Sequence, residues 1–221
     1  MSRDDAIQDY SHLDYKPRST NNVERDTQQM NRIIGGQEAD VGRYSYIASL
    51  TNERAHTCGG SLIADDIILS AAHCAEHIDG VDLGRHDLTD KTENKERFNI
   101  DKYLQHPTYK DAAGSFDNDF LVIKLFGWSS DGNVARINSN PNIPQNQEEV
   151  YVAGWGVVNT NTDKTADRLK EVSVNYMTND VCRSKKGNIQ GYNQMFSLSN
   201  KISGNMMCAL DDGEDSCKQE E

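Results

Sequence analysis

Short apolar runs rich in β-branched and aromatic residues alternate along this chain with clusters of turn-forming residues. The clearest runs cover residues 43–50, 59–74, 97–104, 120–125 and 148–158. Glycine, proline, asparagine and aspartate separate them, as in the segment NPNIPQN at residues 140–146. Runs of this length and composition predict β-strands, and no long stretch has the period of a helix. The pattern therefore predicts an all-β protein, built as a barrel or a sandwich.

One short helix and one polar leader depart from this pattern. The helix is predicted from about Thr178, where that residue or one of the two after it can cap the first turn, and it carries Cys182. Residues 1–32 are polar and charged and have no sustained period, so we expect a disordered or loosely attached leader. The strand-rich body follows, which divides the chain into a leader, 1–32, and a domain, 33–221.

The chain is strongly acidic. Its 221 residues include 35 Asp and Glu against 23 Lys and Arg, which gives a net charge of −12 at pH 7. Such a surface repels phosphate backbones, which argues against nucleic acid as a partner, and it attracts cationic peptides. No apolar run is long enough to cross a bilayer, so we expect no membrane span.

The cysteines are odd in number and unevenly spaced. They are Cys58, Cys74, Cys182, Cys208 and Cys217. Because none forms a CxxC pair, a zinc site is disfavoured, and two disulfides with one leftover thiol is the simplest interpretation. Disulfides imply an oxidising compartment, yet the N-terminus has no apolar segment of a secretory signal. Either the start of the chain is incompletely represented, or export is unconventional.

The first candidate functional segment is RIIGG, residues 32–36, where the leader gives way to the body. The simplest interpretation is a strand that starts after a turn. The alternative is a processing site, because cleavage after Arg32 would release the α-ammonium group of Ile33. That cation could be buried only if a carboxylate pairs with it.

Two further segments carry candidate catalytic residues. A bridge between Cys58 and Cys74 would stabilise the fold by about 3 kcal/mol and would fix the backbone of His73, which stands directly before the second cysteine. Small alanines beside that histidine leave room around its ring, which suits a general base. Asp119 stands at the mouth of an apolar strand, where a carboxylate needs a donor. The imidazole N–H of His73 is such a donor.

The ordered set of segments resembles a known family. RIIGG, CGGSLI, LSAAHC, DNDFLVIKL, GWG and MMCALDDGEDSC occur in one chain in this order. Together they resemble a trypsin-like serine endopeptidase of the chymotrypsin family, from Arg32 to about Gln219. The resemblance implies two antiparallel β-barrels, the second incomplete at its C-terminal end. It also implies hydrolysis of protein or peptide substrates after Lys or Arg, activation by another protease, a monomeric secreted protein and no cofactor.

The resemblance also assigns roles to individual residues. His73 matches the general base, and Asp119 matches the aspartate that orients it. Asp215, in DSC, matches the carboxylate on the floor of the pocket that selects lysine or arginine. Cleavage after Arg32 would make Ile33 the new N-terminus that inserts into the body after activation.

The family pattern further implies a disulfide pairing and the absence of a metal. The matched bridges are Cys58–Cys74 and Cys182–Cys208, which leaves Cys217 as the free thiol. Arg85 stands where calcium-binding relatives use a glutamate, so a guanidinium argues against calcium at this loop. The acidic residues that follow, from Asp87 to Glu96, are interpreted as a solvated loop.

The serine nucleophile of the family has no counterpart in this sequence. Extending the match without gaps beyond Cys217 puts Gln219 and Glu220 at the glycine and aspartate of the family segment Gly-Asp-Ser-Gly-Gly-Pro, and Glu221 at its serine. A glutamate cannot become an alkoxide-like nucleophile. We therefore expect a domain truncated before the nucleophile and inactive as given. The alternative is a non-catalytic homologue that acts as a binding module.

Overall fold

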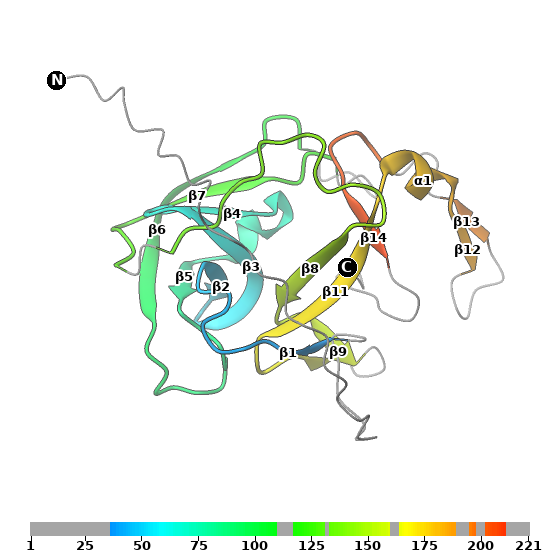
Figure 1. Cartoon of the computed structure of the whole chain (residues 1–221). Helices are drawn as coiled ribbons and strands as arrows, with labels where there is room; N and C mark the ends of the chain where they lie inside the picture. Colours follow the sequence, from blue (N-terminus) through cyan, green and yellow to red (C-terminus); the bar gives the residue numbers. More distant parts are fainter. Residues whose placement is uncertain are drawn as a thin grey trace, which may run out of the picture.

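The computed structural model describes residues 36–109, 117–130, 133–159, 164–188, 195–197 and 202–210. Six strands form a closed barrel in the order β2-β3-β4-β7-β6-β5 (Figure 1). They are β2 (Ile47–Asn52), β3 (Ala55–Ala64), β4 (Ile67–Ser70), β5 (Gly80–Leu83), β6 (Glu96–Gln105) and β7 (Leu121–Leu125). A 3₁₀ helix, η1 (Ala72–His77), follows β4. All neighbouring strands of the barrel are antiparallel.

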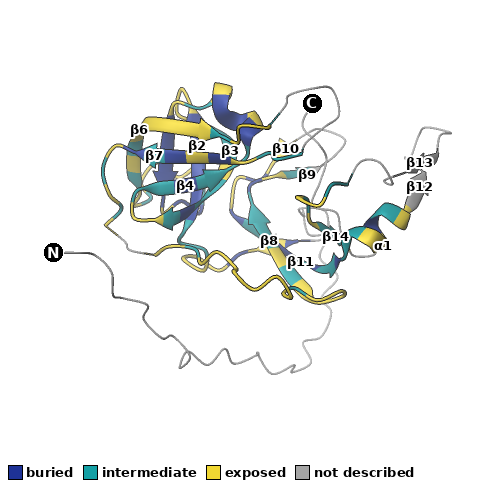
Figure 2. Ribbon diagram, turned by 90° about the horizontal axis from the view of Figure 1, so that it is seen from above, coloured by how far each residue is buried: buried dark blue, intermediate teal, exposed yellow. Residues whose placement is uncertain are grey.

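The barrel closes around alternating apolar side chains. In β7, Leu121, Ile123 and Leu125 are buried, whereas Val122 and Lys124 between them are not. Other strands add apolar side chains to the same core cluster, among them Ala48 and Leu50 of β2 and Val81 and Leu83 of β5. Figure 2 colours each residue of the barrel strands by its burial, with the buried ones in dark blue. Each buried Leu or Ile stabilises the fold by about 1.5–3 kcal/mol relative to an exposed one.

A second sheet lies beside the barrel and is organised around β11 (Lys170–Met177). β8 (Glu149–Gly154) pairs along one edge of β11, while β1 (Gln37–Glu38) and β14 (Cys208–Leu210) pair with the two ends of the other edge. Val172 and Val174 form its small core.

Two strand pairs and one helix are the remaining elements among the described residues. One two-stranded pair is formed by β9 (Val157–Asn159) and β10 (Lys164–Thr165), and another by β12 (Lys186–Asn188) and β13 (Met195–Ser197). The helix α1 (Asn179–Ser184) follows β11.

Trp155 joins the barrel to the second sheet. Its side chain is buried and belongs to one apolar cluster with Ala39, Ile47 and Leu169. Its ring N–H donates to the backbone oxygen of His86, at 3.1 Å. Because Ile47 is in β2 and Leu169 precedes β11, this cluster fixes the barrel against the second sheet.

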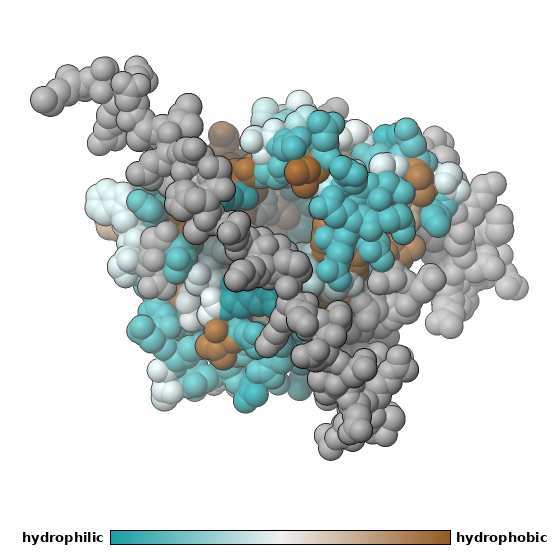
Figure 3. All heavy atoms as spheres, in the orientation of Figure 1, coloured by the Kyte–Doolittle hydropathy of each residue, from teal (hydrophilic) through white to brown (hydrophobic). Residues whose placement is uncertain are grey.

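The prediction of an all-β protein with few helices is confirmed. The helix predicted from Thr178 is also present, and Thr178 occupies its N-cap position, although no side chain makes a capping hydrogen bond there. No helix among the described residues is long and apolar enough to cross a membrane. Among the described residues on the face drawn in Figure 3, hydrophilic side chains predominate and hydrophobic ones are scattered. The last residues of the predicted domain, 211–221, lie outside the described residues, so the C-terminal end of the predicted second barrel is not described.

Candidate functional site

His73 and Asp119, which stand 46 residues apart in sequence, are in direct contact. The Nδ1 atom of His73 lies 2.8 Å from Oδ2 of Asp119. The backbone N–H of His73 donates to Oδ1 of the same carboxylate, at 2.9 Å. The structure therefore brings together the two residues that the sequence proposes as base and orienting acid.

Strand pairing explains why these two residues meet. β4 and β7 are antiparallel, and Ser70 at the end of β4 is the register partner of Leu121 at the start of β7. His73 follows β4 by three residues, and Asp119 precedes β7 by two. Both side chains consequently lie at the same end of the same strand pair.

The contact fixes the protonation of the imidazole ring. An ionised carboxylate can only accept hydrogen bonds, so Nδ1 of His73 must carry the proton that it donates to Asp119. The neutral ring then has an acceptor lone pair at Nε2. The side chain of His73 is 49% exposed, whereas that of Asp119 is 17% exposed. The ring is therefore accessible to a substrate while its partner is largely shielded from water.

The first disulfide fixes the backbone next to the histidine. Cys58 in β3 and Cys74 in η1 are joined, with an S–S distance of 2.03 Å, as the resemblance implies. His73, Cys58 and Cys74 present possible metal-ligand atoms within 4.8 Å of one another. Because both sulfurs form the disulfide, neither is available as the thiolate that a metal requires.

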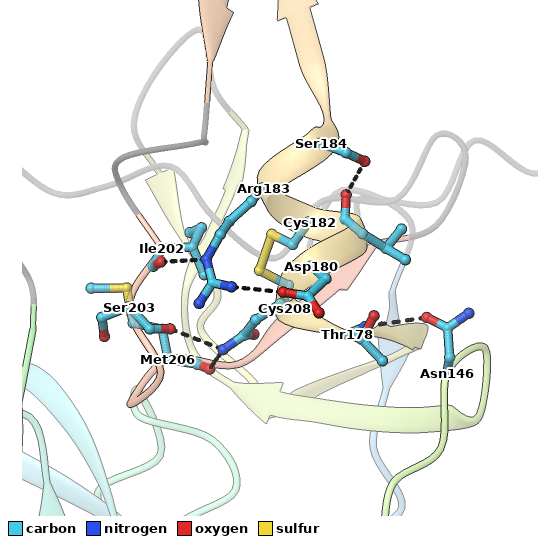
Figure 4. The surroundings of a disulfide bond; sticks show 12 residues. Asn146, Thr178, Asp180, Cys182, Arg183, Ser184, Ile202, Ser203, Met206 and Cys208 are labelled. Atoms are coloured by element: carbon cyan, nitrogen blue, oxygen red, sulfur yellow. Dashed lines mark hydrogen bonds and ion pairs between the residues drawn. A yellow bond between two sulfur atoms is a disulfide. The ribbon is translucent and has the colours of Figure 1, made fainter.

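The second disulfide joins Cys182 of α1 to Cys208 of β14, as Figure 4 shows. Its S–S distance is 2.04 Å. This is the other bridge that the resemblance implies. It fastens the helix to the edge of the second sheet.

A buried arginine occupies the acidic loop for which the sequence argues against calcium. The guanidinium of Arg85 donates to the backbone oxygens of Asp87, at 2.9 Å, and Asp90, at 3.2 Å. Its Nε lies 3.3 Å from Oε2 of Glu93, and the Arg85 side chain is only 5% exposed. A fixed cation thus stands among the loop oxygens, which supports the argument against calcium.

The same loop corrects one interpretation made from the sequence. Glu93 is 17% exposed, and its Oε1 accepts the backbone N–H groups of His86 and Asp87, at 2.7 and 3.1 Å. The hydroxyl of Ser129 donates to Glu96, at 2.6 Å. Glu93 and Glu96 are therefore not simply solvated. They accept hydrogen bonds from N–H and O–H groups that need a partner in the folded protein.

Sequence reasoning missed a buried carboxylate in the second half. Glu171, in β11, is 3% exposed and accepts from Tyr44 Oη at 2.5 Å and Gln37 Nε2 at 3.1 Å. Nε of Arg43 lies 3.1 Å from it, and the Arg43 guanidinium stands 5.3 Å from the centre of the Tyr44 ring. Burial is the main cause that raises the pKa of Tyr44, and the hydrogen bond to Glu171 is the second cause. Glu171 stands in the segment KEVSVNYM, where valines recur at every second position, but no local feature marks this charge as buried.

Several predicted residues fall outside the described part of the chain. They are Arg32, Ile33, Asp215, Cys217 and Glu221. Their roles stay predictions. Gly36 is the first described residue after the predicted cleavage site, and it is buried directly before β1.

Comparisons with known proteins agree on one family. The sequence model described as Trypsin matches residues 33–219, and this match begins at the residue that follows the predicted cleavage site. Duodenase-1 of Bos taurus is 30% identical over 178 residues, which are 76% of this chain and 68% of that protein. Trypsin-3 of Homo sapiens is 30% identical over 192 residues, 86% of this chain and 58% of that protein.

A solved structure shows the same fold. It is described as neuropsin, a serine protease expressed in the limbic system of mouse brain. The TM-score is 0.66 at 22% identity, and the match covers 80% of this chain and 74% of that one.

Proposed function

Because this chain belongs to the trypsin family of serine proteases, we propose that its chemistry is the hydrolysis of peptide bonds after lysine or arginine, with His73 as the general base. The observation that carries the proposal is the double contact of Asp119 with His73. One contact orients the ring and the other ties its backbone to the same carboxylate.

The proposed mechanism follows from this arrangement. Nε2 of His73 accepts the proton of a serine hydroxyl while the oxygen attacks the substrate carbonyl carbon. The ring, now an imidazolium, is stabilised by the Asp119 carboxylate at 2.8 Å. It then gives the proton to the leaving amine. Water repeats the cycle on the acyl intermediate.

Specificity and activation rest on the family match alone. Asp215 matches the acid on the floor of the pocket, where a buried carboxylate would be compensated by the cation of the substrate side chain. Arg32 matches the cleavage site of the leader, and Ile33 the released ammonium. We propose a protein or peptide substrate, an activating protease and a monomer in an oxidising compartment, which the two disulfides favour.

The 221-residue polypeptide, assayed by itself, is proposed to be inactive. Glu221 aligns with the nucleophile and Gln219 with a glycine whose N–H belongs to the oxyanion hole. Loss of one such donor alone lowers the rate by about 10²–10³. Without the serine, the proposed pair has no hydroxyl to deprotonate.

The test compares two chains with Arg and Lys ester substrates. One is the 221-residue polypeptide, and the other carries a family segment beginning Gly-Asp-Ser-Gly-Gly-Pro in place of residues 219–221. We expect turnover only in the second chain, lost in its His73→Ala variant. Turnover by the first chain would refute its inactivity. A folded second chain, with both described disulfides intact, that binds substrate without cleaving it would favour a binding module instead.

A further inference from the structure

A turn in the second half of the molecule contacts the segment that leads into Asp119. The hydroxyl of Ser203 donates to Oδ1 of Asp117, at 2.5 Å. The side-chain amide of Asn205 donates to the same oxygen, at 3.2 Å, and to Oδ1 of Asn118, at 3.0 Å. The contacts join positions 86 to 88 residues apart. They connect the two halves directly beside the catalytic pair.

The turn is itself held in place by α1. The side-chain amide of Asn179 donates to the backbone oxygens of Ser203 and Met206, both at 2.9 Å. Nε of Arg183 donates to the backbone oxygen of Ile202, at 2.9 Å, and Figure 4 shows this guanidinium reaching across to the turn. The second disulfide fastens α1 to the strand that follows. Residues 202–206 therefore form a fixed support rather than a free loop.

The segment that receives these contacts turns sharply before β7. Asn118 has a left-handed backbone, with φ of 61°, which is uncommon outside glycine, asparagine and aspartate. The N–H of Phe120 donates to the oxygen of Asn118, at 2.8 Å, so the chain turns tightly around Asp119. On the C-terminal side of Asp119 the chain enters β7, whose pairing with β4 begins at Leu121. On its N-terminal side, Asp117 and Asn118 are held by the bonds from Ser203 and Asn205.

We propose that Ser203 and Asn205 are positioning residues for the catalytic pair, acting through Asp117 and Asn118 on Asp119. The inference rests on the proposed function of His73 and Asp119, but its test does not depend on hydrolysis. The Ser203 hydroxyl, and next the Asn205 amide, hold the pKa of the Asp117 carboxyl below its usual range. Asp117 therefore stays an ionised acceptor in the folded protein.

The contacts form a short path from the turn to the base. Ser203 and Asn205 contact Asp117 and Asn118, which directly precede Asp119, and Asp119 contacts His73. A displacement of the turn would therefore be transmitted to Asp119 and then to the ring of His73.

The test follows the ring N–H proton of His73 by NMR in the ¹⁵N-histidine-labelled 221-residue chain, assigned by its absence in His73→Gln. Ser203→Ala and Asn205→Ala should each raise its exchange rate with solvent by about tenfold, the effect of losing one or two hydrogen bonds. Asp117→Ala should act in the same way from the other side of the contact. Ser203→Thr, which keeps the hydroxyl, should retain the rate of the parent chain.

The matched control is Ser184→Ala, which removes a hydroxyl of α1 that donates to Val181 and does not contact the turn. Its exchange rate should equal that of the parent chain. If Ser203→Ala, Asn205→Ala and Asp117→Ala lower stability but leave the exchange rate unchanged, the three residues are merely structural and the proposal is wrong. A parent chain with no protected His73 ring proton would instead refute the catalytic pair itself.

Discussion

Asp119 holds His73 at two points, with Oδ1 accepting the backbone N–H at 2.9 Å and Oδ2 lying 2.8 Å from ring Nδ1. A single contact would leave the ring free to rotate about its bonds. With both contacts, the carboxylate fixes the backbone position, the ring orientation and the tautomer together. The lone pair of the neutral ring is consequently confined to Nε2.

The first prediction concerns this tautomer. In Asp119→Asn, the side-chain amide oxygen keeps accepting the backbone N–H of His73. The NH₂ group of the same amide then faces Nδ1, which must accept a hydrogen bond from it. The ring proton should move to Nε2, as ¹⁵N chemical shifts of the His73 ring would show. Asp101→Asn, an exposed site in β6, should leave the tautomer as it is. A proton that stays on Nδ1 in Asp119→Asn would contradict the assigned hydrogen bond.

The second prediction concerns the loop around Arg85. Removing the guanidinium in Arg85→Ala leaves Glu93 and two backbone oxygens without their cation. The free energy of unfolding, measured with urea, should fall by about 3 kcal/mol. Arg85→Lys keeps the charge but lacks the forked N–H donors of arginine, so the free energy of unfolding should fall by less than in Arg85→Ala. A decrease below about 0.5 kcal/mol in Arg85→Ala would show that the buried cation is not needed.

The third prediction concerns the buried carboxylate of Glu171. Glu171→Ala leaves the Tyr44 hydroxyl and the Gln37 amide without their acceptor and removes the partner of Arg43. We expect the free energy of unfolding to fall by about 2 kcal/mol, since Arg43 is partly solvated. The control, Glu76→Ala, changes an exposed glutamate of η1. Equal effects of the two substitutions would show that the cluster contributes nothing specific.

The fourth prediction concerns pH. Burial lowers the pKa of His56 from its usual 6.5. The unfolded chain then binds this proton at a higher pH than the folded one, so stability present above about pH 6.5 is lost as the pH falls. His56→Gln should lose less unfolding free energy than the parent chain between about pH 7.5 and about pH 5.5. His77→Gln, at an exposed site, should behave as the parent chain does, and a loss in His56→Gln equal to the parent's would contradict the assignment.

Much of the fold could be predicted because strands leave a local signal. In β7 the apolar residues Leu121, Ile123 and Leu125 alternate with more exposed positions, and the alternation is visible in the sequence. Barrel closure could not be read in the same way. It depends on pairs such as Leu50 with Val81, which join β2 to β5 across intervening strands. No local pattern specifies such partners.

The candidate site likewise contains residues that could be predicted from local sequence and residues that could not. His73 and Asp119 could be predicted because each stands in a distinctive local context. His73 directly precedes a cysteine, and Asp119 directly precedes an apolar run. Glu171 and Asn205 could not, because what makes them important is a partner far away in sequence. Arg43 lies 128 residues before Glu171, and Asp117 lies 88 residues before Asn205. Only the folded chain brings these charges and donors together.

The central proposal is that His73, oriented by Asp119, acts as the general base for the serine nucleophile of a trypsin-family protease. The most direct measurement is intact-mass analysis after treatment with a serine-directed phosphonate bearing an arginine side chain. We predict no adduct on the 221-residue chain, and one adduct, lost in His73→Ala, on the chain that carries a family segment beginning Gly-Asp-Ser-Gly-Gly-Pro in place of residues 219–221. A stoichiometric adduct on the 221-residue chain would contradict the account.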